Sequence, residues 1–208
     1  MKSLEISEIF YSLQGESSYA GMPCTFVRLA GCNLRCSYCD TKYSYAPGEQ
    51  IAISQIMAEV AKYPSSLVEL TGGEPLMQDN SILLLTQLLG KGYRVLLETN
   101  GSLTLRQVPA QVIKIVDIKC PASGMGDSFL INNLDYLTVN DELKFVISDR
   151  GDYVFAREFV RSHELLGYTI HFSPVYQTMK PEELADWILK DGLEVKLSLQ
   201  LHRILNLR

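Results

Sequence analysis

The sequence predicts an α/β fold, a partial and open (β/α) barrel of about six to seven strands. Apolar runs of strand length alternate along the chain with stretches of helical periodicity. Strands that alternate with helices form a parallel sheet with right-handed crossovers. The 208 residues fall short of the ~250 that a complete eight-stranded barrel needs. We therefore expect one domain, residues 1–208, with a TIM-like barrel that does not close.

The N-terminal part begins with two strands separated by a polar turn. Residues 4–11 alternate polar and apolar side chains, as an edge strand does, and a glycine-containing stretch at 12–17 ends them. Residues 25–30 are a nearly continuous apolar run, which indicates a buried strand. Residues 51–63 show helical apolar spacing, with Ser54 as the expected N-cap.

The remaining elements continue the alternation. A strand at 67–71 precedes a helix at 81–89, which Gly90 and Gly92 are expected to end. Pro181 followed by two acidic residues is typical of the first turn of a helix. The same periodicities predict strands at 93–98, 113–118, 142–147, 168–172 and 193–199, and helices at 153–166 and 181–190.

Composition excludes several classes of protein. Hydrophobic residues are 47% and charged residues 21%, which is typical of a globular protein and not of a disordered one. A net charge of −5 gives no reason to expect binding to nucleic acid or to an anionic membrane. No apolar run reaches the ~18 residues that span a bilayer, and the first residues lack a signal-peptide core. Five cysteines, an odd number, indicate a reducing cytoplasm without disulfides.

Three cysteines, Cys32, Cys36 and Cys39, follow the strand at 25–30 with C-x3-C-x2-C spacing. Three local thiolates suit three irons of a [4Fe-4S] cluster. The fourth iron then stays open to a cofactor or substrate, as catalytic metal sites keep one position free. The alternatives are a structural zinc site, which needs a fourth ligand, or cysteines that only pack. The other two cysteines, Cys24 and Cys120, are expected to be small buried hydrophobes.

Further motifs stand where predicted strands end, at 70–75, 98–101, 117–121 and 173–176. When each motif is considered alone, a tight turn accounts for the Gly72–Gly73 pair, and Asp117 and Lys119 would be solvent-exposed side chains. In a row of strand ends they favour one site, because chemistry in parallel barrels collects at that edge. Of the three histidines, only His202 is expected to reach this site. From their chemistry alone, Gln14, Arg28 and Thr41 are ordinary surface or loop groups.

Six segments occur in a characteristic order, at 9–16, 21–28, 31–41, 71–75, 98–101 and 117–121. Over nearly its full length the chain resembles the 7-carboxy-7-deazaguanine synthase family of radical S-adenosylmethionine (SAM) enzymes. S-L-Q-G-E together with C-x3-C-x2-C-D-T is specific to that family, whereas the cysteine triplet alone would fit any radical SAM enzyme. The resemblance implies an open barrel of the radical SAM type.

The resemblance also implies roles for single residues. It assigns no catalytic side chain, because the radical is generated on SAM. Cys32, Cys36 and Cys39 would hold a [4Fe-4S] cluster, and Thr41 would hold Mg²⁺. The residues implied to bind SAM are Tyr38, Asp40, Gly73, Asp117, Lys119, Ser173, Pro174, Val175 and Tyr176. The residues implied to bind substrate are Leu13, Gln14, Gly15, Arg28, Thr71 and His202.

The implied activity is conversion of 6-carboxy-5,6,7,8-tetrahydropterin to 7-carboxy-7-deazaguanine with loss of ammonia, in queuosine and deazapurine biosynthesis. The implied partners are the pterin substrate, an electron donor such as flavodoxin or ferredoxin, and a second copy of the chain in a homodimer. Two other functions remain open. A glycyl-radical activase would need the cysteines but no polar groups for a small substrate. A zinc or electron-transfer module would need Cys24 or Cys120 as a fourth ligand.

Overall fold

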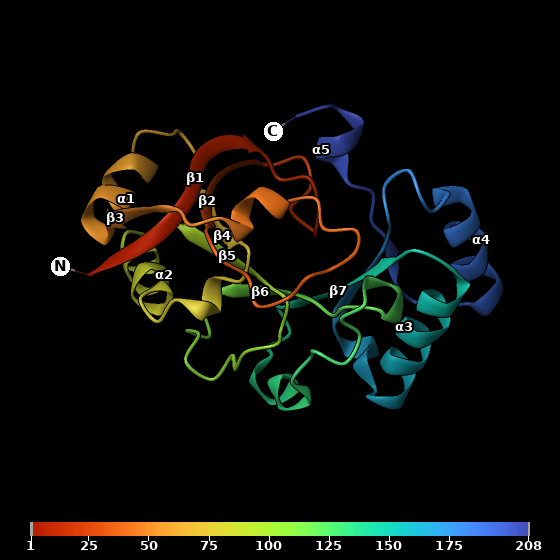
Figure 1. Cartoon of the computed structure of the whole chain (residues 1–208). Coiled ribbons are helices and arrows are strands. Elements are labelled where there is room, and N and C mark those ends of the chain that lie inside the picture. Colours follow the sequence, from red (N-terminus) through yellow and green to blue (C-terminus); the bar gives the residue numbers. More distant parts are fainter. Residues whose placement is uncertain (1, 208) are drawn as a thin grey trace.

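Among residues 2–207, which the computed structural model describes, nine strands form a single sheet in the order β3-β1-β2-β4-β5-β6-β7-β8-β9 (Figure 1). The strands are β1 (Ser3–Leu13), β2 (Pro23–Leu29), β3 (Glu49–Ala52), β4 (Leu67–Gly72), β5 (Arg94–Thr99), β6 (Ile113–Asp117), β7 (Glu142–Ile147), β8 (Thr169–Pro174) and β9 (Lys196–Leu197). The helices are α1 (Ile53–Val60), α2 (Ser81–Gly90), α3 (Arg150–Ser162), α4 (Pro181–Asp191) and α5 (Leu201–Ile204). Every helix in the same residues is too short or too polar to cross a membrane.

The sheet confirms the predicted open barrel. β2 and β4 to β9 run parallel to one another, so seven strands belong to the parallel part. β1 pairs antiparallel with both β2 and β3. Within residues 2–207 no pairing joins the outermost strands, β3 and β9, and the sheet therefore does not close.

Three elements differ from those that the sequence predicts. The expected helix at 51–63 is two elements, because β3 takes its first residues and α1 begins only at Ile53. The backbone N–H of Ala52 donates to the Gln55 side chain at 3.2 Å, so Ser54 is not the cap. β3 also covers β1, which is therefore not an edge strand. The last predicted strand, 193–199, is reduced to the two paired residues of β9.

Two hydrophobic clusters lie on opposite faces of the sheet. The larger packs the outward strand side chains against the helices that surround the sheet (Figure 1), for example Leu70 of β4 and Leu84 of α2. The smaller lies inside the barrel and includes Phe26, Leu96 and Ile115. Burial of each such side chain stabilises the fold by roughly 1.5–3 kcal/mol. The inner cluster fills the lower barrel, and polar side chains occupy the strands above it.

The segment between β1 and β2 spans the open side of the sheet. The carbonyl of Gly15 accepts the N–H of Leu201, the first residue of α5, at 2.8 Å. Further along, the N–H of Ser18 donates to Glu142 Oε2 at 3.0 Å, and Lys196 Nζ donates to Ser18 Oγ at 2.8 Å. The residues that follow β1 are thereby joined to β7, β9 and α5. We call residues 14–22 the closing segment.

Candidate active site

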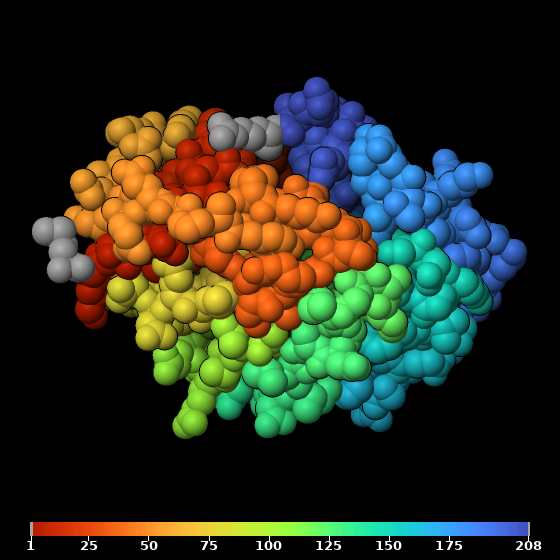
Figure 2. Space-filling model, in the orientation of Figure 1, coloured from red at the N-terminus to blue at the C-terminus, as the bar shows by residue number. Residues whose placement is uncertain are grey.

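A cavity of about 550 Å³ lies inside the barrel at the carboxyl ends of the parallel strands. Consecutive strands contribute to its wall, from Arg28 of β2 through Thr71 of β4 and Asp117 of β6 to Lys144 of β7. The closing segment and α5 complete the wall on the open side. Figure 2 shows the orange part of the chain, which follows β2 and carries the cysteines, lying across the centre of this face. All strand-end motifs therefore meet in one place.

Nearly all residues that the sequence singled out line this cavity. They are Leu13, Gln14, Gly15, Arg28, Cys32, Cys36, Tyr38, Cys39, Asp40, Thr41, Thr71, Gly73, Asp117, Lys119, Val175, Tyr176 and His202. Ser173 and Pro174 do not line it, because they lie within buried β8. Ser173 Oγ has no hydrogen-bond partner among the described residues. Neither of the other two histidines lines the cavity, because His163 is exposed on the surface and buried His171 hydrogen-bonds Glu142.

The three cysteines of the triplet share the cavity as free thiols. The backbone N–H of Leu34 donates to Cys32 Sγ at 3.4 Å, a contact that favours a thiolate. Burial nevertheless raises the pKa of Cys32 and of Cys36 above the ordinary thiol value. Ionisation of these thiols must therefore be driven by iron, and the donor set fits a cluster held by three thiolates.

The other two cysteines do not line the cavity. Cys24 belongs to the inner hydrophobic cluster and Cys120 to the outer one, and both are fully buried. Within residues 2–207, no three His, Cys, Asp or Glu side chains are grouped closely enough for a single metal ion. A cluster has no such requirement, since each thiolate binds a different iron. The geometry thus disfavours a four-ligand zinc site.

The Gly72–Gly73 turn holds the cysteine loop against the end of β4. Gly72 has φ +140°, a conformation that L side chains rarely adopt. A Cβ on Gly73 would lie 1.9 Å from the carbonyl oxygen of Gly31 and 2.9 Å from Cys32 Cβ. The N–H of Glu74 donates to the Gly31 carbonyl at 2.9 Å. The chain itself therefore passes close to both glycines, and the SAM contact that the resemblance implies for Gly73 stays a prediction.

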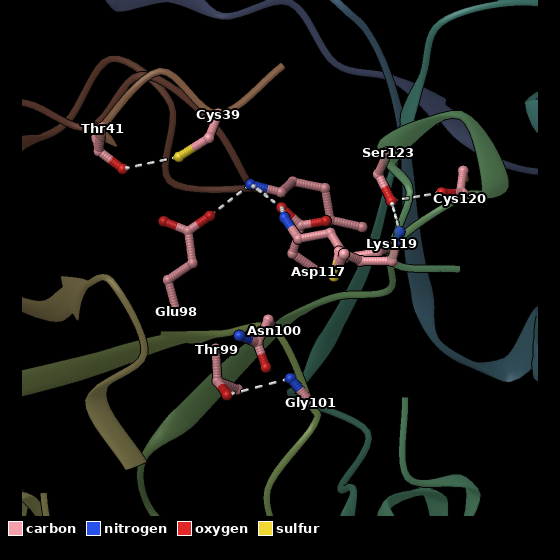
Figure 3. Close-up of polar contacts among 12 residues, drawn as sticks. Cys39, Thr41, Glu98, Thr99, Asn100, Gly101, Asp117, Lys119, Cys120 and Ser123 are labelled. Atoms are coloured by element: carbon pink, nitrogen blue, oxygen red, sulfur yellow. Dashed lines mark hydrogen bonds and ion pairs between the residues drawn. The ribbon is translucent and has the colours of Figure 1, made fainter. Parts of the chain in front are cut away.

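Lys144 is the centre of the charge network in the cavity. Its Nζ contacts Glu16 Oε2 at 2.7 Å and Asp117 Oδ2 at 3.3 Å, and it forms a short ion pair with Glu98. Lys119 Nζ binds the same Asp117 oxygen at 2.8 Å. Burial opposes ionisation of Asp117, but the two lysines outweigh it and hold its pKa below the ordinary value. Figure 3 shows Glu98, Asp117 and Lys119 projecting into one space below Cys39 and Thr41.

Two buried polar atoms of the cavity wall lack partners among the described residues. They are the hydroxyl of Tyr38 and Oδ1 of Asp117. Burial raises the pKa of Tyr38, so its hydroxyl stays protonated and can both donate and accept. Buried polar groups normally have hydrogen-bond partners. These two therefore fit a bound ligand that carries donors and acceptors, as SAM does.

The outer rim of the cavity is built from the cysteine loop, the closing segment and α5. A Cβ on Gly15 would lie 2.1 Å from Nδ1 of His202, so only glycine allows the imidazole this position. Arg203 Nη2 pairs with Asp40 Oδ2 at 3.2 Å and links α5 to the cysteine loop. Thr41 Oγ1 lies 3.7 Å from Cys39 Sγ.

Several residues of the site were given no role of their own by the sequence, although Glu16, Glu74 and Glu98 stand in the motifs at 9–16, 70–75 and 98–101. Glu16, Glu69, Glu98 and Lys144 line the cavity, and Glu74 ties β4 to β5 by accepting from Thr99 Oγ1 and from the Asn100 N–H, both at 2.8 Å. For Glu69 and Lys144 the sequence did contain a signal. Charged residues inside the apolar strands 67–71 and 142–147 are unusual, because lysine and glutamate are rarely buried without partners.

Comparison with known proteins identifies the family. A radical SAM superfamily model matches residues 27–121, which include the cysteine loop and four strands. A 7-carboxy-7-deazaguanine synthase of Koribacter versatilis is 50% identical over 97% of this chain and 96% of its own length. Proteins with the same name from Chlorobaculum tepidum and Thermoplasma acidophilum are 45% and 38% identical over 96% of this chain, and over 93% and 96% of their own lengths. The chain belongs to the 7-carboxy-7-deazaguanine synthase family.

The fold agrees with this assignment. The crystal structure of QueE from Escherichia coli matches 96% of this chain and 95% of its own, with a TM-score of 0.76 at 23% identity. The predicted open barrel of the radical SAM type is thus confirmed. Membership of the 7-carboxy-7-deazaguanine synthase family makes the chain a radical SAM enzyme, which implies a [4Fe-4S] cluster and SAM as cofactors.

Proposed function

We propose that the chain converts 6-carboxy-5,6,7,8-tetrahydropterin to 7-carboxy-7-deazaguanine and ammonia, a step of queuosine and deazapurine biosynthesis. The observation that carries the proposal is the composition of one cavity. Its cysteine loop offers three thiols, and other parts of its wall offer Gln14, Arg28 and His202 to a small polar substrate. A glycyl-radical activase, whose substrate is another protein, has no use for such a wall.

Cluster and SAM together supply, when bound, the radical that removes a hydrogen atom from the substrate. Cys32, Cys36 and Cys39 would hold the cluster and leave its fourth iron open toward the cavity. Tyr38 and Asp117 have unfilled hydrogen-bond capacity for SAM. The other residues proposed to contact SAM are Asp40, Gly73, Lys119, Ser173, Pro174, Val175 and Tyr176.

The remaining residues would bind and orient the substrate. Thr41 would hold Mg²⁺, with water and the substrate carboxylate as further ligands, because one hydroxyl cannot form a magnesium site alone. Arg28 is held in place by Glu8, whose Oε1 lies 2.8 Å from its Nε. Leu13, Gln14, Gly15, Thr71 and His202 complete the proposed substrate site. The walls position the pterin and exclude water, and the cofactor supplies the bond-breaking chemistry.

The test is anaerobic reconstitution with iron and sulfide, followed by turnover with SAM, dithionite and the carboxy-tetrahydropterin. We expect 7-carboxy-7-deazaguanine and ammonia in equal amounts, with SAM not consumed in proportion. A reconstituted protein that cleaves SAM without forming this product would contradict the proposal.

The proposed surroundings of the enzyme follow from the same chemistry. A cluster held by thiolates requires a reducing compartment, so we place the protein in the cytoplasm. Reduction of the cluster requires an electron donor such as flavodoxin or ferredoxin. We also propose a homodimer, and light scattering at micromolar concentration should give twice the mass of one chain; the mass of a single chain would contradict it.

A further inference from the structure

A carboxyl group stands where the inside of the barrel is otherwise apolar. Glu69 points inward from β4 and pairs in register with Phe26 of β2 and Leu96 of β5, both members of the inner hydrophobic cluster. Glu69 is 2% exposed. Burying a carboxyl group costs free energy unless it is neutral or well paired. Packing alone would favour an apolar residue at this position.

The contacts of Glu69 leave part of the carboxyl group available. Gln14 Nε2 donates to Glu69 Oε2 in a short hydrogen bond. The orientation of the Gln14 amide is fixed, because its Oε1 accepts the N–H of Glu16 at 2.8 Å. Glu69 Oε1 has no hydrogen-bond partner within residues 2–207, and the residue lines the cavity. A ligand on the cavity floor can therefore reach this carboxyl group.

The charges around Glu69 decide its protonation. Burial raises its pKa well above the ordinary value, and the negative charges of Glu98 and Glu16 add to the effect. The two cations that lower the pKa of Glu69, Lys144 and Arg28, are themselves paired with other acidic side chains. Lys144 is paired with Glu16, Glu98 and Asp117, and Arg28 is paired with Glu8. These effects favour the protonated form of Glu69, and a protonated carboxyl group offers one donor and one acceptor.

We propose that Glu69 is a substrate-recognition residue, whose carboxyl group forms paired hydrogen bonds with an edge of the heterocycle that carries an N–H donor beside a carbonyl acceptor. This inference rests on the proposed function. The lactam edge of the pterin pyrimidine ring has this pattern. That edge lies at the opposite end of the bicyclic substrate from the carboxylate that we assign to Thr41. In the pair, the carboxyl O–H donates to the ring carbonyl and the ring N–H donates to the carboxyl oxygen.

Two substitutions separate this contact from a structural role. Glu69→Gln keeps one donor and one acceptor in the same shape, whereas Glu69→Leu matches the apolar neighbours and removes both. Glu158→Gln is the control, because it removes a half-exposed carboxylate of α3 far from the cavity. For each reconstituted protein we would measure the Kd of the carboxy-tetrahydropterin by anaerobic calorimetry, KM and kcat, and the temperature of unfolding.

We expect Glu69→Leu to weaken substrate binding and raise KM roughly ten- to hundredfold, because the polar edge of the substrate loses its partners. SAM binding should be unchanged, and the unfolding temperature should change little, because the lost Gln14 hydrogen bond opposes the gain from replacing a buried carboxyl group by an apolar side chain. Glu69→Gln should bind within about threefold of the wild type. If both variants bind like the wild type, Glu69 does not contact the substrate. If Gln is as harmful as Leu, the donor–acceptor pairing is wrong. A wild type that neither binds nor converts the pterin would instead overturn the proposed function.

Discussion

At the scale of single residues, the five cysteines fall into two classes by their surroundings. Cys32, Cys36 and Cys39 face the cavity, whereas Cys24 and Cys120 are buried in hydrophobic clusters. Replacing any of the first three by alanine should abolish cluster binding, because two thiolates cannot replace three. The measurement is the ~400 nm absorbance after anaerobic reconstitution.

The two remaining cysteines are the controls of that experiment. Cys24→Ala and Cys120→Ala should retain the cluster absorbance, although each removes a buried sulfur and lowers stability. Loss of the cluster in either variant, with the protein still folded by circular dichroism, would support a fourth cysteine ligand.

The proposed function assigns Mg²⁺ binding to Thr41, but the structure shows little that supports this role. Its hydroxyl has one neighbour in the structure, Cys39 Sγ at 3.7 Å. If the hydroxyl binds Mg²⁺, Thr41→Val should lower turnover and remove its response to added Mg²⁺. Thr41→Ser should keep most of the activity, since the oxygen remains. A magnesium titration of the three proteins is the measurement.

Measuring the stability of Thr41→Val shows whether a loss of turnover comes from a damaged fold. A loop hydroxyl contributes at most about 1 kcal/mol to folding, so Thr41→Val should unfold nearly as the wild type does and bind SAM equally well. Persistent stimulation of the valine variant by Mg²⁺ would contradict a metal-binding role.

The sequence assigned roles to residues that stand in motifs and none to two charged residues of the cavity, Glu69 and Lys144. Cys32, Gly73 and Asp117 stand in recognisable strings at strand ends. Glu69 and Lys144 lie within strands, where their side-chain direction and the partners of their charge depend on pairing with distant strands. A single sequence gives the charge of such a residue but not its neighbours. The floor of the cavity was therefore less predictable than its rim.

At the scale of elements, the end of β4 and the cysteine loop form one packed unit. A Cβ on Gly73 would overlap the Gly31 carbonyl, which is backbone and cannot move without moving Cys32. Gly73→Ala should therefore reduce cluster loading as well as SAM binding, severalfold or more. Iron content and SAM calorimetry on the same preparation are the measurements.

Gly90 at the end of α2 is the matched control for this substitution. A Cβ there meets no atom within 4 Å, and Gly90→Ala should leave iron content and SAM affinity unchanged. If Gly73→Ala weakens SAM binding at full iron content, the glycine serves the ligand and not the loop.

The elements themselves were predicted well where the periodic stretches are long. The β/α alternation from β4 to α4 was confirmed with shifts of a few residues at the ends. The errors concern β3, with four residues, and β9, with two, which are too short to show a period of their own. β3 exists because it pairs with β1, and only the folded chain shows that contact.

At the scale of the whole molecule, the closing segment and α5 replace the strand that would complete the barrel. Gln200, which precedes α5, donates to Glu16 Oε1 at 3.0 Å, and Arg203 reaches Asp40. The open sheet thus gains a wall that also carries Gln14 and His202, the proposed substrate contacts. Closure of the barrel and recognition of the substrate depend on the same few residues.

Low pH should weaken the contact between the closing segment and β7. Glu142 of β7 accepts from the Ser18 N–H of the closing segment at 3.0 Å and contacts His171 Nε2 of β8 at 2.8 Å. Burial opposes ionisation of Glu142, but these hydrogen bonds outweigh it and lower its pKa below the ordinary value. The folded state therefore binds this proton less readily than the unfolded chain. The resulting stability is complete above the ordinary glutamate pKa and is lost as pH falls through the lowered one.

Glu142→Gln isolates this contribution, because Glu16 and Asp117, whose pKa values are also lowered, titrate in both proteins. We expect the wild type to exceed the variant by roughly 1–3 kcal/mol in free energy of unfolding at neutral pH. The difference should stay constant down to about pH 5 and then shrink with further acidification. Urea unfolding followed by circular dichroism at a series of pH values gives both curves. Parallel curves between neutral pH and the acid limit of folding would show that Glu142 does not link the closing segment to the pH dependence of stability.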